Sequence, residues 1–188
     1  GGFQLWANLP AANKMMDPRY RDVKNAQIPL FTTESGVKIR IICGEVNGIR
    51  GPVQDIVTDP RYLDVTVPAG TQFNLPTTTG HTVFAYVIDG KGCFCQEKNP
   101  FNYPVEGKNY FDIQCEPFIT NGNLVLFEDG EQVIVSTEDV EVRFLLISGK
   151  PIGESVAWFG PIVMNTQAEL RTAFEEYNNG TFIKHKKP

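Results

Sequence analysis

Gly70–Gly90 reads GTQFNLPTTTGHTVFAYVIDG, and its second half, Thr82–Ile88, is a nearly continuous apolar run. A short apolar run between two turn signals predicts a strand that is buried on both faces. Asp89-Gly90 is expected to end this strand, because such dipeptides usually mark turns. The stretch therefore indicates β structure.

Alternating apolar and polar residues continue in both directions from this stretch. Further strands are predicted at Val37–Ile41, Leu63–Val67, Gln132–Ser136 and Val140–Ile147. Glycine, proline, asparagine and aspartate separate these runs. Many short strands with such breaks are typical of an antiparallel sandwich or barrel.

One helix is predicted near the carboxyl end of the chain. Thr166 and Glu169 have the spacing of a capping box. Leu170, Phe174 and Tyr177 then fall on one apolar stripe, and the glycine at position 180 is a stop signal.

Composition restricts the function further. The 188 residues carry a net charge of -5, which argues against a general phosphate-binding surface and direct nucleic-acid binding. No apolar run is long enough to cross a bilayer, and we expect no membrane association. The start shows neither a secretory signal nor an initiator methionine, so we expect processing, a cut or a longer gene product. The four cysteines, Cys43, Cys93, Cys95 and Cys115, are expected to be reduced thiols of a cytoplasmic or nuclear protein.

Gly70 begins a spacing that resembles the first metal-binding motif of cupins. In metal-binding cupins a His-x-His pair and a glutamate follow this glycine at fixed offsets and project into the barrel. At those offsets this chain has Pro76, Thr78 and Val83, and Gly90 closes the motif. Proline and valine cannot bind a metal through their side chains, and a lone threonine is a poor ligand.

Gly122 begins a spacing that resembles the second cupin motif. Val133 stands at the histidine position and Thr137 at the asparagine position. Two such patterns in the right order predict an all-β, cupin-type antiparallel sandwich or barrel with a C-terminal α-helix. They also predict that this barrel holds no metal and that Val83 and Val133 are buried in its interior.

Longer blocks resemble the pirin family. Gly160–Thr166, GPIVMNT, is the most specific of them, and Gly2–Pro10, GFQLWANLP, resembles the signature between the two cupins of a pirin. Further similar blocks are Lys14-Met15, Pro18–Tyr20, Tyr62–Val65, Phe84–Gly90 and Gly149–Glu154. The resemblance covers nearly the whole chain except 93–115, which looks like an insertion relative to shorter pirins.

The resemblance implies a bicupin protein whose iron is held by histidines and a glutamate of the first cupin. None of these ligands maps onto this chain, so we expect no cofactor here and Fe in an N-terminal cupin that would precede Gly1. Pirins are described as nuclear cofactors of Rel-type transcription factors and as dioxygenases that open quercetin. Both roles use the metal-bearing half.

We therefore expect a non-catalytic C-terminal cupin half that gives structural support and an interaction surface to a metal-bearing cupin. The alternative is a part of an iron-dependent quercetin-type dioxygenase or transcription cofactor. A third hypothesis, a small-molecule-binding barrel, requires an apolar cavity between the sheets. The expected partners are the N-terminal cupin, a second copy of the chain, and transcription factors.

The resemblance implies an inter-domain or partner surface at both ends of the chain, because it places the N-terminal segment at the junction between the two cupins and makes the segment Trp158–Met164 a further candidate for that junction. The residues of this surface are Phe3, Leu5, Trp6, Trp158, Phe159 and Met164. The run from Phe3 to Leu9 alternates as a strand does, and a strand without a partner invites dimerisation or strand exchange.

Three regions are expected along the chain. Residues 1–20 would form an inter-domain strand and linker, with a helical turn at Ala11–Met16. Residues 21–160 would form the cupin domain, with a long loop at 93–115. Residues 161–188 would form a strand, the helix and a tail. Aromatic residues of that loop either pack onto the sandwich or bind a partner: Phe101, Tyr103, Tyr110 and Phe111. His81 is either a polar turn residue or an isolated ligand, because the only other histidine is His185.

Overall fold

The structure, a computed structural model, describes residues 2–95 and 117–184. The chain divides into two compact units. Gly1–Asp22 and Ile152–Pro188 together form the smaller unit, and Val23–Pro151 forms the larger one. The smaller unit is thus built from the two ends of the chain.

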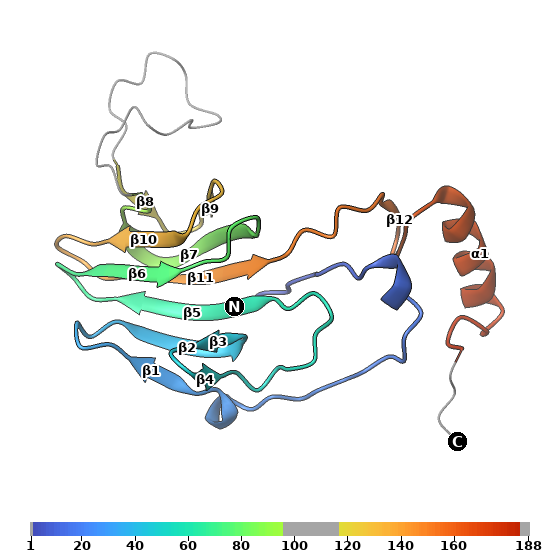
Figure 1. Ribbon diagram of the computed structural model, residues 1–188, viewed down its shortest axis with the longest axis horizontal. Helices are drawn as coiled ribbons and strands as arrows, with labels where there is room; N and C mark the ends of the chain where they lie inside the picture. Colours follow the sequence, from blue (N-terminus) through green and yellow to red (C-terminus); the bar gives the residue numbers. More distant parts are fainter. Residues whose placement is uncertain (1, 96–116, 185–188) are drawn as a thin grey trace, which may run out of the picture. The chain divides into compact units, whose positions relative to one another are not determined.

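The larger unit contains a seven-stranded antiparallel sheet in the order β1-β2-β5-β11-β7-β8, with β9 also paired to β7 (Figure 1). Its strands are β1 (Leu30–Thr32), β2 (Lys38–Cys43), β5 (Arg61–Val67), β7 (Thr82–Gly92), β8 (Ile119–Thr120), β9 (Leu124–Leu126) and β11 (Val142–Gly149). A second layer pairs β6 (Gln72–Pro76) with β10 (Gln132–Ser136). The short elements are η2 (Asn25–Gln27) and the β3 (Glu45–Val46) to β4 (Ile49–Arg50) hairpin. This arrangement confirms the predicted all-β fold class.

The core of the larger unit comes from the period-two alternation of its strands. Leu63, Val65 and Val67 of β5 are completely buried, as the alternation predicted. From the second layer, Phe73 contacts Phe144 of β11 with ring centroids 6.2 Å apart. Phe94 lies edge-on to the same ring at 5.1 Å. Side chains from both layers thus fill one interior.

Strand β7 corrects two expectations. Its Val83, Ala85 and Val87 are buried, but Phe84 and Tyr86 between them are partly exposed, so only one face of the strand is fully covered. The strand also continues through Gly90 rather than ending there, because the register with β11 shifts by one residue in a β-bulge. Gly90 has φ +74, and a Cβ there would overlap the Glu141 carbonyl oxygen. Only glycine suits this position.

Beyond the bulge, the chain that continues from β7 pairs with the second layer. Directly after β7, the backbone of Cys93 exchanges two hydrogen bonds with Ser136 of β10, at 2.8 and 2.9 Å. One continuous stretch of chain therefore pairs with strands of both layers.

The smaller unit packs a hairpin, β12 (Ala157–Phe159) and β13 (Ile162–Met164), against α1 (Gln167–Asn178). Its core residues are Ala157, Ile162, Met164, Leu170 and Ala173. Because β12 pairs with β13, both strands belong to this unit, whose C-terminal part begins at Ile152. No helix within the described ranges is long and apolar enough to span a membrane.

The helix signals are largely confirmed. Thr166 is the N-cap, and its hydroxyl accepts the Glu169 backbone N–H while the Glu169 carboxylate accepts that of Thr166. The buried stripe is narrower than predicted, since Tyr177 is 58% exposed and contacts the Phe182 ring instead.

The N-terminal segment does not form the predicted strand. Residues 2–10 belong to no strand, and a 3₁₀ turn, η1 (Ala11–Asn13), follows near the predicted helical turn. Alternation alone cannot make a strand, because the backbone groups need a neighbouring strand to pair with. No described strand pairs with this segment.

Candidate functional site

The barrel interior at the predicted ligand positions is apolar. Val83 on β7 and Val133 on β10 are 5% and 2% exposed, which confirms that both are buried. Val133 lies opposite Leu75 of β6 in the antiparallel register. Both valines belong to the continuous core cluster of the larger unit.

Pro76 and Thr78 do not point into this interior. Both are exposed, and Pro76 is the last residue of β6, paired with Gln132. The inward-facing pair on this strand is instead Phe73 and Leu75. Counting residues from Gly70 places the expected ligand positions at exposed residues, because side-chain direction follows the register of β6 and not the distance from the preceding turn.

Thr137, at the asparagine position of the second motif, has a structural contact set. Its hydroxyl donates to the Pro68 carbonyl oxygen and accepts the Thr71 backbone N–H at 3.1 Å. Its own backbone N–H donates to the Thr71 carbonyl at 3.0 Å. The side chain ties the turn after β5 to the end of β10 and is not available as a ligand.

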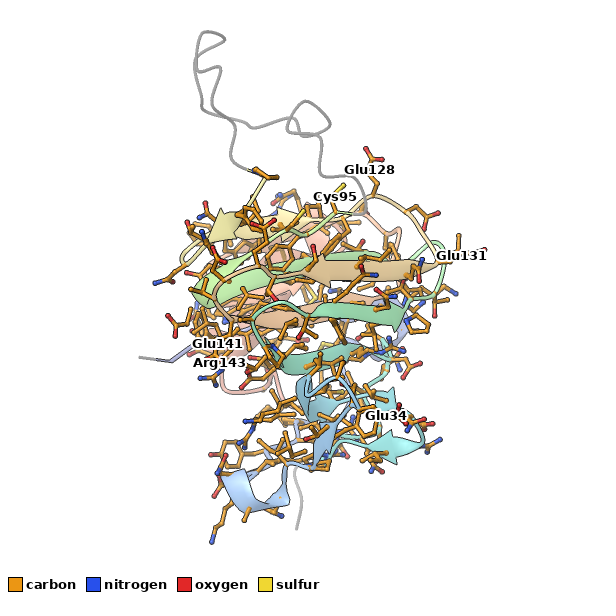
Figure 2. The ribbon with its side chains drawn as sticks, turned by 90° about the vertical axis from the view of Figure 1, so that its left-hand side faces the viewer. Glu34, Cys95, Glu128, Glu131, Glu141 and Arg143 are labelled. Carbon is orange, nitrogen blue, oxygen red and sulfur yellow. The ribbon has the colours of Figure 1, made fainter. Side chains whose placement is uncertain are left out.

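These residues do not fit the iron site that the cupin fold can hold. The inward positions around both valines carry Phe73, Leu75 and Ala85, none of which can coordinate a metal. The ranges 2–95 and 117–184 hold no group of three or more histidine, cysteine or acidic residues placed to bind one. In Figure 2 the labelled charged groups Glu131, Glu141 and Arg143 lie around the outside of the strands.

The predicted partner surface lies in the smaller unit. Phe3, Leu5 and Trp6 are 54%, 43% and 62% exposed, and Trp158 and Phe159 are 66% and 70% exposed. Met164 must be removed from the set, because it is buried in the core of the unit. Its position on β13 opposite Ala157 turns it toward α1.

A charged recess in the larger unit was not predicted from the sequence. It has a volume of about 510 Å³ and lies between the end of β2, the β3–β4 hairpin and the loop 53–60. Arg50 donates to Glu45 at 2.6 Å, and this hydrogen bond raises the pKa of Arg50. Asp55 and Asp59, also in the lining, have positive φ angles. The recess is not the apolar cavity that the small-molecule hypothesis requires, since charged groups line it.

Comparison with known proteins agrees with this geometry. The family model described as the pirin C-terminal cupin domain matches residues 62–183. The chain belongs to the pirin family. Pirin-1 of Arabidopsis thaliana is 36% identical over 95% of this pirin chain and 56% of its own length. A putative quercetin 2,3-dioxygenase of Thermoplasma acidophilum is 31% identical over 100% of this chain and 67% of its own.

A solved structure is also similar to this chain. A crystal structure of quercetin 2,3-dioxygenase from Acinetobacter baumannii has a TM-score of 0.74 and 25% identity, covering 94% of this pirin chain and 55% of that protein. The chain therefore spans about half to two thirds of the length of the relatives it matches.

The remaining candidate residues of this pirin have ordinary environments or fall outside the described ranges. His81 is a half-exposed turn residue whose backbone N–H donates to the Thr78 carbonyl at 3.1 Å. Cys43 and Cys93 are buried and Cys95 is partly exposed. The Cys43 thiol donates to the Pro60 carbonyl oxygen at 3.2 Å, and the Cys93 thiol donates to the Cys95 carbonyl oxygen at 3.7 Å. Some predicted positions lie outside the described residues: Cys115, His185 and the loop aromatics Phe101, Tyr103, Tyr110 and Phe111.

Proposed function

We propose that this pirin chain is a non-catalytic cupin half, which gives structural support and an interaction surface to a metal-bearing cupin. The apolar interior around Val83 and Val133 carries the proposal. A barrel whose inward positions are filled by hydrocarbon side chains is stable without a metal and has no place for one. Any iron would then belong to the other cupin.

The exposed apolar residues of the smaller unit support the second part of the proposal. Five large apolar side chains of this unit are exposed to water: Phe3, Leu5, Trp6, Trp158 and Phe159. Exposed apolar groups of this kind mark interaction surfaces. Trp158 and Phe159 stand on a hairpin that α1 packs against, so they are carried by a folded element. Anchors on rigid elements lose little conformational entropy on binding.

The test compares the chain alone with the chain fused, ahead of Gly1, to the part of the Thermoplasma relative that it does not match. Both proteins are loaded with Fe(II), desalted and analysed for metal. We expect iron in the fusion and none held stoichiometrically by the chain alone. One iron per isolated chain would overturn the proposal.

Association tests the surface separately. The unmatched part of the relative is expressed by itself and titrated with the chain. Trp158→Ala should weaken binding about tenfold or more, because a buried aromatic anchor commonly contributes that much. Tyr20→Ala is the matched control, since Tyr20 is 91% exposed in the same unit and outside the predicted surface.

A second function, part of a quercetin-type dioxygenase, is favoured by the likeness to the Acinetobacter enzyme over 94% of the chain. In that case the iron-loaded fusion should consume oxygen and quercetin together, and the chain alone should consume neither. An iron-loaded fusion that leaves quercetin intact would exclude this activity for the pair.

A further inference from the structure

One carboxylate in the smaller unit joins the two segments of chain that build it. Glu154 lies shortly before β12, and its Oε2 accepts the backbone N–H of Ala11 at 2.7 Å. The same oxygen accepts the Asn165 side-chain amide at 2.8 Å. Glu154 thus contacts both the N-terminal segment and the connection between β13 and α1.

The C-terminal side of this contact is held firmly. The Asn165 side chain also donates to the Ser155 carbonyl at 3.1 Å, and the Ser155 hydroxyl donates back to the Asn165 carbonyl at 2.9 Å. The Asn165 backbone N–H donates to the Glu169 carboxylate at 3.2 Å. Because its neighbours are fixed by several bonds, the Glu154 carboxylate is a preorganised acceptor for the Ala11 amide.

The N-terminal segment has two more contacts near this point. Lys14 donates to the Asn8 side chain at 2.6 Å, and the carboxylates of Glu154 and Glu169 attract its charge. The pKa of Lys14 is nevertheless lowered, because partial burial outweighs these attractions. Met15 packs against the core of the unit. The segment is therefore anchored at Ala11 by a charged hydrogen bond and at Met15 by apolar contact.

We propose that Glu154 is a positioning residue, the clasp that holds the N-terminal segment on the β12–β13 hairpin and α1. With the clasp closed, the apolar residues of the N-terminal segment and those of β12 belong to one ordered unit. That this ordered unit then receives the metal-bearing cupin rests on the proposed function. The clasp itself does not depend on it.

Hydrogen exchange measures the clasp directly. The Ala11 amide of the full chain should exchange about tenfold faster in Glu154→Ala, because its acceptor is lost and bonds to charged groups are the stronger ones. In Glu154→Gln the exchange rate of the Ala11 amide should lie between those of the wild type and Glu154→Ala, since the glutamine amide oxygen still accepts a hydrogen bond but carries no charge. Glu175→Ala is the matched control, an exposed carboxylate on α1 of the same unit. Trypsin cleavage after Lys14 should follow the same order.

The outcomes separate the clasp from the proposed function. Unchanged Ala11 exchange in both Glu154 variants would overturn the clasp. If exchange accelerates, association with the unmatched part of the Thermoplasma relative is measured next, and Glu154→Ala should weaken it about tenfold while Glu175→Ala leaves it unchanged. Accelerated exchange with unchanged association would overturn the positioning role. A wild-type chain that never associates would instead overturn the proposed function and leave the clasp standing.

Discussion

Replacing Val133 with histidine places an imidazole where a cupin metal ligand would stand, inside a packed interior. Val133 is 2% exposed and faces Leu75, so the ring nitrogens would find neither water nor a polar partner there. An unpaired buried polar group costs about 1–3 kcal/mol, and the extra volume costs about 1–3 kcal/mol more. Since these costs overlap, we expect the free energy of unfolding to fall by about 2–4 kcal/mol.

Urea denaturation followed by fluorescence measures this loss, with the slope of the transition as a check that the unfolded state is unchanged. Gln132→His is the matched control, because Gln132 precedes Val133 on β10 and is exposed. The control should change stability by less than about 0.5 kcal/mol. A Val133→His chain that unfolds at the wild-type urea concentration would show that this position opens to water, and the reasoning from a filled interior would then be refuted.

Three further predictions concern metal, backbone and association. The isolated chain, dialysed against Fe(II) and desalted, should contain far less than one iron per molecule by elemental analysis; stoichiometric iron would contradict the apolar interior. Gly90→Ala should lower the free energy of unfolding by at least about 2 kcal/mol, because of its φ of +74 and the overlap with Glu141. Gly130→Ala, where nothing lies within 4 Å of the added methyl group, should be nearly neutral in the same urea titration. Light scattering over a concentration series should show self-association of the chain that Trp158→Ala reduces, and a strictly monomeric wild type would refute an open apolar surface.

Local patterns were sufficient for most of the fold. The alternation of Leu63–Val67 and the capping residue Thr166 each predicted an element that the structure contains, because both signals act within a few residues. Asp89-Gly90 was misinterpreted, since a glycine with positive φ serves a turn and a bulge equally well. Only the pairing of β7 with β11, distant in sequence, distinguishes the two.

The candidate site depended more on tertiary structure. Spacing from Gly70 led to the correct prediction that Val83 is buried, but it selected Pro76 where the register of β6 turns Leu75 inward. The strand expected at Phe3–Leu9 needed a partner that sequence alternation cannot supply. The charged recess is built by irregular backbone around Asp55 and Asp59, which leaves no periodic signal in the sequence.

The pairing of β7 and Cys93 with both layers bears on how the larger unit comes apart. The seven-stranded sheet cannot separate from the β6–β10 layer while this stretch stays paired on both sides, at β11 and at Ser136. Partial opening of one layer therefore breaks pairing in the other. Because neither layer opens alone, we expect the two layers to unfold as one cooperative unit. Slowly exchanging amides of β5 and β10 should accordingly report the same opening free energy, even though no ladder pairs these two strands directly.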